Sequence, residues 1–380
     1  MESGNIISID GKEYEFMGGD TILDVARRNG IDIPTLCYMK GVSPTGACRM
    51  CMVEMSGAKA LVASCAMAAA PKMAVKTQTE RVMKARRVNL ELLLASGHHN
   101  CLVQDLDMDT WTDFQLKALS TTEHMDICPA YGDCRLQELA IKYGVKGNRF
   151  TPAESRYPIE TVNPLIVRDF SRCILCGRCV QACNEVQVNN AISFGYRGNS
   201  SKIVAKGDRP LKDSDCVFCG ECVQACPVGA LVTKASMEAK DRPIGETKPV
   251  RTTCSYCGVG CQLYLHVKDN KVVRVTGVEG VGPNYGSLCV KGRFGYDFVH
   301  SPERLKKPLI RNNGGGFREA SWDEALGLIA NKLSEIKKQS GPDSIGLLCS
   351  ARITNEENYL AQKFARAAIG TNNVDHCARL

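Results

Sequence analysis

The stretch Cys173–Cys183 reads "CILCGRCVQAC", and the later stretch Cys216–Pro227 reads "CVFCGECVQACP". Both have the spacing C-x2-C-x2-C-x3-C, and together they form the one clear internal repeat of the chain. Four thiolates at this spacing are typical ligands of an iron–sulfur cluster, whereas a pair of zinc knuckles fits the spacing poorly. The repeat therefore predicts a domain over residues 160–238 that holds two clusters of four irons each.

The fourth cysteine of each run is expected to bind the cluster of the other run, as in other two-cluster proteins of this spacing. The first predicted cluster takes Cys173, Cys176, Cys179 and Cys226. The second predicted cluster takes Cys216, Cys219, Cys222 and Cys183. Asn184 stands where a proline usually follows the fourth cysteine, and we expect little consequence from it.

The whole chain has 380 residues, of which 21 are cysteine, and its length indicates several domains. Its first residues show no signal peptide and no twin-arginine pair, and no apolar run approaches the ~18 residues of a membrane span. Cysteines in such a chain point to metal rather than disulfides, so we expect a cytoplasmic protein. The net charge of +7 is scattered, which argues against a nucleic-acid partner.

A first group of cysteines has the spacing C-x10-C-x2-C-x13-C and consists of Cys37, Cys48, Cys51 and Cys65. The residues before it predict a strand, a turn at Asp10-Gly11, a second strand and a short helix over 21–29. We predict a two-iron cluster in a β-grasp ferredoxin-like domain over residues 1–80. A structural zinc ion is the alternative, and it fits the wide first gap less well.

A second group mixes histidine and cysteine. A helix is predicted over 78–95, with Thr77 and Glu80 as its capping box. It leads to His98, His99 and Cys101, and Cys128 and Cys134 follow much later. Three cysteines and one histidine can hold a four-iron cluster in a small domain over residues 81–150, although an exposed histidine pair more often faces solvent. His124 is a further candidate ligand.

A third kind of four-cysteine site has the spacing C-x2-C-x3-C-x27-C and consists of Cys254, Cys257, Cys261 and Cys289. Alternating apolar residues over 263–275 predict a hairpin with its turn at Asp269-Asn270. Of the two remaining cysteines, Cys349 is expected to be an inert core thiol at the end of a strand over 344–349. Cys377 has no assigned role.

The last part of the chain reads as the opening of an α/β domain. Ser321 and Glu324 predict the start of a helix, and a second helix is predicted over 355–369. We expect the apolar face of residues 321–380 to be incompletely covered. The segment 314–316 is expected to be a flexible loop, and no glycine motif for a nucleotide follows a strand.

In this order, the motifs of residues 1–240 resemble the N-terminal region of the large iron–sulfur subunit of respiratory complex I and of iron-only hydrogenases. The stretches "CSYCGVGC", "LCVKGRFGYDFVHSPERLKKPLIR" and "NEENYLAQKFARAAIGTNNVDHCARL" resemble the alpha subunits of the molybdenum or tungsten formate dehydrogenases, in the molybdopterin oxidoreductase superfamily. The resemblance implies a multidomain α+β protein. In it, a four-iron domain over residues 250–305 and the start of an α/β molybdopterin oxidoreductase domain over 306–380 follow the three cluster domains above.

The resemblance also implies roles for particular residues. Cys254, Cys257, Cys261 and Cys289 are similar to the ligands of the four-iron cluster nearest the pterin. Lys291 resembles the lysine that relays electrons between that cluster and the molybdopterin guanine dinucleotide, and an exposed lysine is its plain alternative. The histidine site of the family reads H-x3-C-x2-C-x5-C, whereas here Gly97 stands at the histidine position. His98 and His99 therefore both remain candidates, with a slight preference for His99.

The activity implied is the oxidation of formate to CO2 at Mo or W, with electrons leaving through the ferredoxin, histidine-ligated and two-iron clusters to a flavin- and NAD(P)-binding partner subunit. The full complement implied is one two-iron cluster, four four-iron clusters and molybdopterin guanine dinucleotide. The alternative is a non-catalytic electron-transfer subunit of a hydrogenase or complex I-like assembly. In the resembling family a metal-ligating selenocysteine or cysteine follows the stretch similar to "NNVDHCARL". The expectation is therefore a coding sequence that continues through UGA, and a 380-residue chain that is inactive alone.

Overall fold

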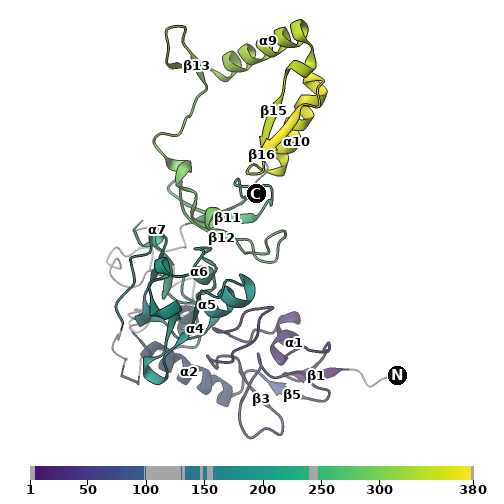
Figure 1. Cartoon of the computed structure of the whole chain (residues 1–380). Coiled ribbons are helices and arrows are strands. Elements are labelled where there is room, and N and C mark those ends of the chain that lie inside the picture. Colours follow the sequence, from purple (N-terminus) through teal and green to yellow (C-terminus); the bar gives the residue numbers. More distant parts are fainter. Residues whose placement is uncertain are drawn as a thin grey trace. The chain divides into compact units, whose positions relative to one another are not determined.

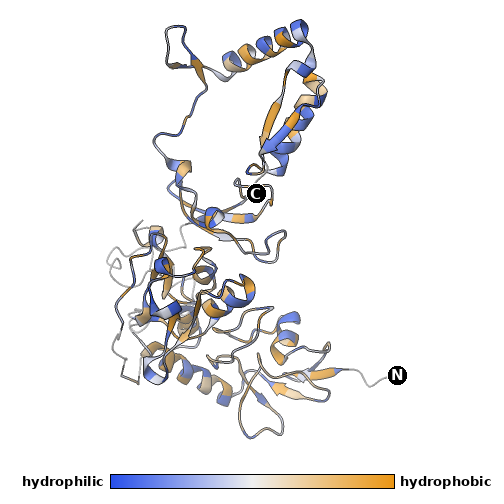
Figure 2. Ribbon diagram, viewed as in Figure 1, coloured by the Kyte–Doolittle hydropathy of each residue, from blue (hydrophilic) through white to orange (hydrophobic). Residues whose placement is uncertain are grey.

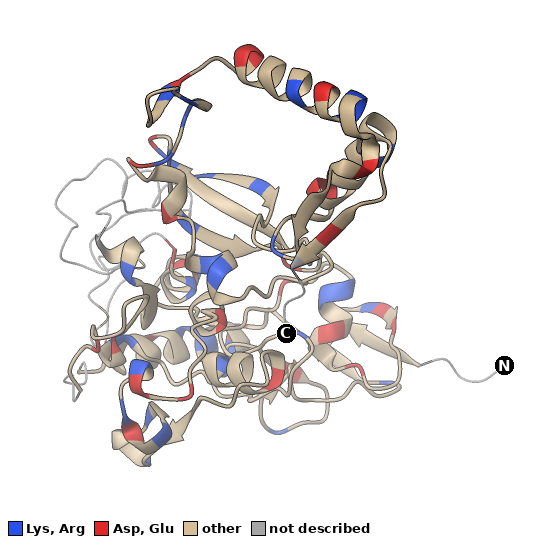
Figure 3. Ribbon diagram, turned by 45° about the horizontal axis from the view of Figure 1, so that its top comes forward, with Lys and Arg blue, Asp and Glu red and all other residues tan. Residues whose placement is uncertain are grey.

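The computed structural model describes residues 5–97, 99, 130, 133–145, 149–151, 157–238 and 247–377. The chain forms two compact units, Met1–Lys248 and Pro249–Leu380 (Figure 1). No helix among these described residues is both long enough and apolar enough to cross a bilayer. Figure 3 shows basic and acidic residues interspersed along the described part of both units, in keeping with the scattered charge predicted from the sequence.

The first unit begins with a hairpin of β1 (Ile6–Ile9) and β2 (Lys12–Glu15). Asp10 and Gly11 both have a positive φ, of 51° and 82°, which is the geometry of the two-residue turn that matches strand twist. The turn predicted at these two residues is therefore confirmed.

A mixed five-stranded sheet is built around this hairpin in the order β2-β1-β5-β3-β4. Its other strands are β3 (Met52–Met55), β4 (Val62–Ala63) and β5 (Ala74–Lys76). Strand β1 pairs in parallel with β5, and the other pairs are antiparallel. Helix α1 (Ile22–Arg28) starts at a capping box made by Thr21 and Asp24 and buries its apolar residues in the core of this sheet.

Helix α2 (Glu80–Ala95) matches the predicted helix, but its N-cap is Thr79, whose hydroxyl accepts a bond from Val82 N at 3.3 Å. The prediction of Thr77 as the cap was wrong. The Thr77 amide and hydroxyl both bond the Asp10 carboxylate, so a contact across the fold takes the groups that a cap would use. Helix α4 (Arg135–Lys142) packs against α2.

The cysteine repeat forms two short helices, α5 (Arg178–Gln181), which continues as a π-helical turn over Ala182–Val186, and α6 (Glu221–Ala225). The glycines that begin these helices, Gly177 and Gly220, have φ of 80° and 72°. Two small antiparallel pairs complete this part, β6 (Ile166–Arg168) with β9 (Leu231–Thr233) and β7 (Ile192–Gly195) with β8 (Lys202–Ala205). The remaining elements are the 3-10 turns Phe170–Arg172, Gly198–Ser200, Lys206–Asp208 and Leu211–Asp213, and α7 (Lys234–Glu238).

The second unit opens with a sheet of β10 (Lys248–Thr253), β11 (Gln262–Lys268) and β12 (Lys271–Gly277). The turn between the last two strands has positive φ at Asp269 and Asn270, so the predicted hairpin is confirmed. After this sheet, the chain forms α8 (Val290–Phe294), the 3-10 turn Asp297–His300, and a hairpin of β13 (Leu309–Arg311) and β14 (Phe317–Glu319).

The rest of this unit contains α9 (Trp322–Ser340), β15 (Leu347–Ser350), α10 (Asn355–Lys363) with a π-helical continuation over Phe364–Ile369, and β16 (Val374–Cys377). The predicted cap of α9 is confirmed, since the Ser321 hydroxyl accepts a bond from Glu324 N at 3.1 Å. The strand predicted at 344 begins three residues later because Pro342–Ser344 form a 3-10 turn. Cys349, expected in a core, is partly exposed.

Apolar residues recur along α9 and β15, as Figure 2 shows, and several of their side chains are largely exposed. Leu326 is 56% exposed, Ile329 is 53% exposed and Leu348 is 89% exposed. The incompletely covered apolar face predicted from the sequence is therefore present among the described residues.

Candidate metal centres

The first group of cysteines converges between the sheet and the loop after α1. Cys37, Cys48, Cys51 and Cys65 are all buried. The Cys51 and Cys65 sulfurs lie 3.3 Å apart, and the Cys37 thiol forms hydrogen bonds with Cys48 and Cys65. The structure thus brings together all four ligands predicted for the two-iron cluster.

Hydrogen bonds among these four thiols shift their pKa values in opposite directions. The hydrogen bond with Cys48 lowers the pKa of Cys37, and the bond with Cys65 lowers the pKa of Cys51 to about 6. Their partners carry the opposite change, because the hydrogen bond with Cys37 raises the pKa of both Cys48 and Cys65. Cys37 and Cys51 therefore ionise readily, whereas cluster binding must displace the protons of Cys48 and Cys65.

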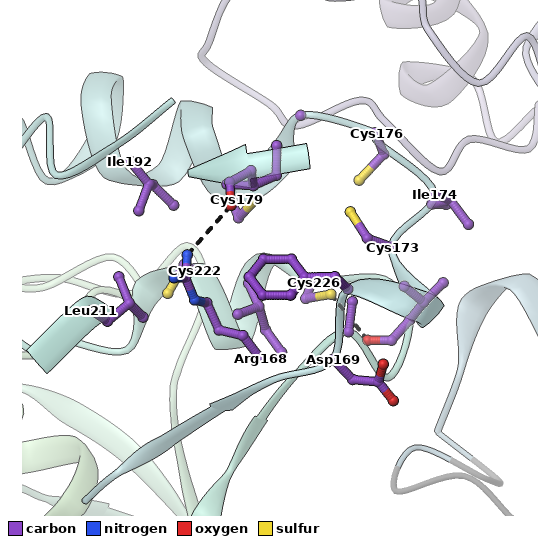
Figure 4. Close-up of a pocket in the computed structure, with 16 residues that line it drawn as sticks. Arg168, Asp169, Cys173, Ile174, Cys176, Cys179, Ile192, Leu211, Cys222 and Cys226 are labelled. Atoms are coloured by element: carbon purple, nitrogen blue, oxygen red, sulfur yellow. Dashed lines mark hydrogen bonds between the residues drawn. The ribbon is translucent and has the colours of Figure 1, made fainter. Parts of the chain in front are cut away.

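A cavity of about 40 Å³ lies in the cysteine repeat, between α5, α6 and β6 (Figure 4). Its wall contains all four ligands predicted for the first four-iron cluster, namely Cys173, Cys176, Cys179 and Cys226. Most of the other lining side chains are apolar, including Ile174 and Val228. The cavity exceeds the ~10–15 Å³ that one water needs, yet it offers water few polar partners. A largely apolar chamber lined by these four thiols and by Cys222 suits a metal–sulfide cluster.

Burial is the main reason why the pKa of each of these four thiols is raised. It raises the pKa of Cys173 to about 11 and that of Cys176 to about 12, and it also raises the pKa of Cys179 and Cys226. Before a cluster is bound, the four groups are therefore neutral thiols, and binding releases their protons. Within the described ranges, no three His, Cys, Asp or Glu side chains are placed to hold a single metal ion.

The second predicted four-iron site lies in the same repeat. Burial raises the pKa of the Cys216 thiol, and Cys219 and Cys183 raise it further, so Cys183 of the first run lies near Cys216 of the second. The Ala191 amide donates to the Cys183 sulfur at 3.3 Å. Cys222 also lines the cavity of the first site and acts electrostatically on Cys179. The two predicted sites are therefore immediate neighbours.

One backbone device recurs at these sites: the amide two residues after a ligand donates to its sulfur. Phe218 N lies 3.4 Å from the Cys216 sulfur. The equivalent bonds reach the sulfurs of Cys48, Cys173, Cys176 and Cys254 from Met50, Leu175, Arg178 and Tyr256. Such bonds orient and stabilise thiolate ligands and are one means of setting a cluster potential.

In the second unit, Cys254, Cys257, Cys261 and Cys289 form one electrostatically linked group. Burial raises the pKa of Cys254 and of Cys261, with the neighbouring cysteines as further causes. The Cys254 amide donates to the Cys261 carbonyl at 2.8 Å, which closes the loop between them. Cys289 is the N-cap of α8, and Lys291, predicted as an electron relay, is partly buried on that helix.

Asn284, which no sequence motif marks, holds the loop before Cys289 in place. The Asn284 side chain accepts a bond from Gln262 N at 2.7 Å and donates to the carbonyls of Gln262 and Ser287, at 3.1 and 2.9 Å. It thereby ties the loop before Cys289 to the strand that follows Cys261. An asparagine in a loop carries no periodic signal, so only its contacts reveal this role.

The histidine-containing site is placed only in part. His98, Cys101, Cys128 and the rival His124 lie outside the described residues. Cys134 is buried as the N-cap of α4, in the same core as Cys48 and Cys176. At the end of α2, a Cβ on Gly97 would lie 2.0 Å from the Ser171 carbonyl oxygen, so this end abuts the turn before Cys173.

Thr45 joins the two-iron site to the first four-iron site. Its hydroxyl is hydrogen-bonded to the Cys37 thiol and lies 3.5 Å from the Cys176 carbonyl oxygen. Next to it, Ser43 N donates to the Glu185 carboxylate at 2.9 Å. This junction could not be predicted from the sequence, because Thr45 and Cys176 are 131 residues apart in the chain.

Protonation of His266 gives the second unit a defined pH response. Burial, followed by the charge of Arg274 on the paired strand, lowers the pKa of His266 from 6.5 to about 4. Its ring nitrogen lies 2.9 Å from the Thr276 hydroxyl. The unfolded chain takes up this proton near pH 6.5 and the folded chain only near pH 4, so stability is lost as the pH falls through this interval.

The His266→Gln variant is expected to lose less stability than the wild type as the pH falls from about 6.5 to about 4. Thermal unfolding midpoints measured across this interval test the prediction. Equal pH slopes for both proteins would contradict this.

Family models match four parts of the chain. They are a 2Fe-2S iron–sulfur cluster binding domain over residues 6–80, a 4Fe-4S dicluster domain over 172–230, a molybdopterin oxidoreductase Fe4S4 domain over 247–301, and the molybdopterin oxidoreductase family over 304–380. These matches support the presence of the two-iron, four-iron and molybdopterin oxidoreductase domains that the sequence predicts.

Similar proteins carry several names. A Bacillus subtilis (strain 168) protein named as a formate dehydrogenase is 35% identical over 98% of this chain and 39% of its own length. The NADPH-Fe(3+) oxidoreductase subunit alpha of Geobacter sulfurreducens is 36% identical over 98% of this chain and 40% of its own. The chain thus spans about two fifths of the length of these relatives. Among solved structures, a chain of an NAD+-reducing NiFe-hydrogenase matches with a TM-score of 0.52 and 31% identity, over 63% of this chain and 91% of that one.

Proposed function

This chain belongs with the molybdopterin oxidoreductases that carry an N-terminal iron–sulfur region, and we propose that it is the electron-transfer region of a formate dehydrogenase. The observation that carries the proposal is the convergence of four cysteines at each of several sites, above all the four around the cavity in the repeat. The fold proposed for residues 1–80 is the β-grasp ferredoxin type, and the compartment proposed is the cytoplasm.

The proposed ligands follow the convergence of the thiols. A two-iron cluster is held by Cys37, Cys48, Cys51 and Cys65. Three four-iron clusters are held by Cys173, Cys176, Cys179 and Cys226, by Cys216, Cys219, Cys222 and Cys183, and by Cys254, Cys257, Cys261 and Cys289. A fourth uses Cys101, Cys128, Cys134 and either His98 or His99. When bound, such clusters supply transfer of one electron at a time.

The protein's own residues set the order and the potentials. Backbone amides donate to ligand sulfurs at four of these sites, and Thr45 contacts both Cys37 of the two-iron site and Cys176 of the first four-iron site. We therefore propose that electrons pass between these two sites through the Thr45 contact. The histidine-containing site is proposed as a neighbour of the same core, on the evidence of Cys134. Lys291 is proposed as the residue that links the site in the second unit to molybdopterin guanine dinucleotide bearing Mo or W.

Formate is the proposed substrate because relatives at 30–35% identity are named as formate dehydrogenases. A second candidate is NADPH-dependent reduction of Fe(III), because a relative of equal similarity carries that name. The hydrogenase likeness supports a flavin- and NAD(P)-binding partner, since that neighbour is named as NAD+-reducing. A hydrogenase subunit is less favoured because the neighbour covers 63% of this chain.

The test has two parts. The 380-residue chain, purified without oxygen, is expected to contain about 18 iron atoms and to show both two-iron and four-iron EPR signals after reduction. It is expected to show no formate turnover by itself. The native complex, isolated from its host through this chain, is expected to reduce NAD(P)+ with formate. Fe(III) reduction by NADPH without any formate activity would instead establish the second candidate. A chain that binds zinc and no iron would overturn the proposal.

A further inference from the structure

Arg86, on α2, is the largest fully buried side chain of the described structure, with 1% of its surface exposed. Its guanidinium donates three hydrogen bonds. Nε donates to the Met50 carbonyl at 3.1 Å, Nη2 to the Met52 carbonyl at 3.0 Å, and Nη1 to the Tyr143 hydroxyl at 3.2 Å. The Tyr143 ring also lies within 5.9 Å of the guanidinium carbon.

The two carbonyls belong to the residues on either side of Cys51. One guanidinium therefore donates hydrogen bonds to the backbone immediately before and immediately after Cys51, a proposed ligand of the two-iron cluster. Because that fork is planar and rigid, it fixes the spacing of the two carbonyls as well as their direction. Arg86 thus holds the backbone on both sides of Cys51.

The charge of Arg86 has no carboxylate partner within ion-pair distance among the described residues. Asp32 is an acid on whose pKa Arg86 acts, but that carboxylate is 60% exposed and is paired with Lys142. A buried charge that bonds only neutral groups is costly, typically by several kcal/mol. A negatively charged group in the same core would offset that cost, and four thiolates around two irons form such a group.

We propose that Arg86 is a positioning residue of the two-iron site, which orients the Cys51 segment and supplies the fixed positive charge that raises the reduction potential of the cluster. This inference rests on the proposed two-iron cluster. Reduction places one electron on the cluster without a proton, so its negative charge grows by one. A fixed cation in a buried site then stabilises the reduced form more than the oxidised form.

Arg87 provides a matched control on the same helix. Its side chain is exposed, and its Nε donates to the carbonyl of the same Tyr143 at 3.1 Å. It therefore carries an equal charge one position away, but it bonds neither carbonyl beside Cys51. If Arg86 only joined α2 to the Tyr143 segment, substitution of Arg86 and of Arg87 would have similar effects.

The experiment is a redox titration of the full chain with its clusters bound, followed through the EPR signal of the two-iron cluster. In Arg86→Gln, the ratio of reduced to oxidised cluster at a fixed potential is expected to fall about tenfold. This corresponds to a midpoint about 59 mV more negative for a one-electron couple. Arg86→Lys, which keeps the charge, and Arg87→Gln are both expected to stay within about threefold of the wild-type ratio.

Each outcome decides the inference. An intact two-iron signal with an unchanged midpoint in Arg86→Gln overturns it. If Arg86→Gln fails to assemble the cluster, Arg86→Lys decides, since the charge is kept while the paired carbonyl contacts are lost. A wild-type midpoint in Arg86→Lys then supports the charge effect, and a reduced-to-oxidised ratio that falls tenfold at the same fixed potential overturns it. A wild-type chain without any two-iron signal would instead count against the proposed function.

Discussion

The Cys226→Ala variant is expected to lose the four-iron cluster proposed for Cys173, Cys176 and Cys179, and to keep the cluster of its own run. The reason is that the Cys226 thiol lies in the cavity wall with those three cysteines, although it is the last cysteine of the second run. Iron content is expected to fall by about four atoms per chain. Reduction of the two-iron cluster by the remaining four-iron clusters is expected to slow about 10- to 100-fold, because the lost cluster adjoins the Thr45 junction.

Iron analysis, EPR of the reduced chain and stopped-flow reduction check this result. The spectrum of Cys226→Ala should match that of Cys173→Ala and differ from that of Cys216→Ala. Cys349→Ala is the matched control, since Cys349 is a partly exposed thiol outside every proposed site. It should keep its full iron content. A Cys226→Ala spectrum that matches Cys216→Ala would contradict the exchange of the fourth cysteine between runs.

The Gly277→Ala variant is expected to lose the cluster of the second unit without any change to a ligand. A Cβ at Gly277, the last residue of β12, would lie 1.9 Å from the Gly286 carbonyl oxygen. Gly286 is itself closely packed, since a Cβ at that position would lie 3.3 Å from the Glu279 Cα, so this backbone has little room to move aside. The added methyl must therefore displace the segment that carries Cys289, at a cost on the order of a few kcal/mol.

Iron content and the thermal unfolding midpoint of the purified chain test this prediction. Gly314→Ala is the control, because no heavy atom lies within 4 Å of the Cβ it would add and its φ is not in the left-handed range. That variant should behave like the wild type in both measurements. Wild-type iron content and an unchanged midpoint in Gly277→Ala would show that the two glycines are not in tight contact.

Local features of this protein could be read from its sequence. The turns at Asp10-Gly11 and Asp269-Asn270 were predictable because left-handed backbone favours these residue types, and the cysteine groups were predictable because each ligand set is mostly compact in sequence. Three features that the sequence did not indicate share one physical cause. The Thr77 hydroxyl is taken by Asp10, and Arg86 and Thr45 act through partners in distant segments. No local pattern encodes such contacts.

The shared core of the first unit bears on how this protein can be recombined. Cys37, Cys48, Cys134 and Cys176 are packed in one apolar cluster, although they come from three successive cysteine groups. A chimera that exchanges residues 1–80 alone would cut through this interior and expose apolar surface on both halves of the graft. The natural point of exchange lies near residue 248, where the two compact units meet in sequence. To join this electron-transfer region to another enzyme, residues 1–248 should therefore be transferred together as one unit.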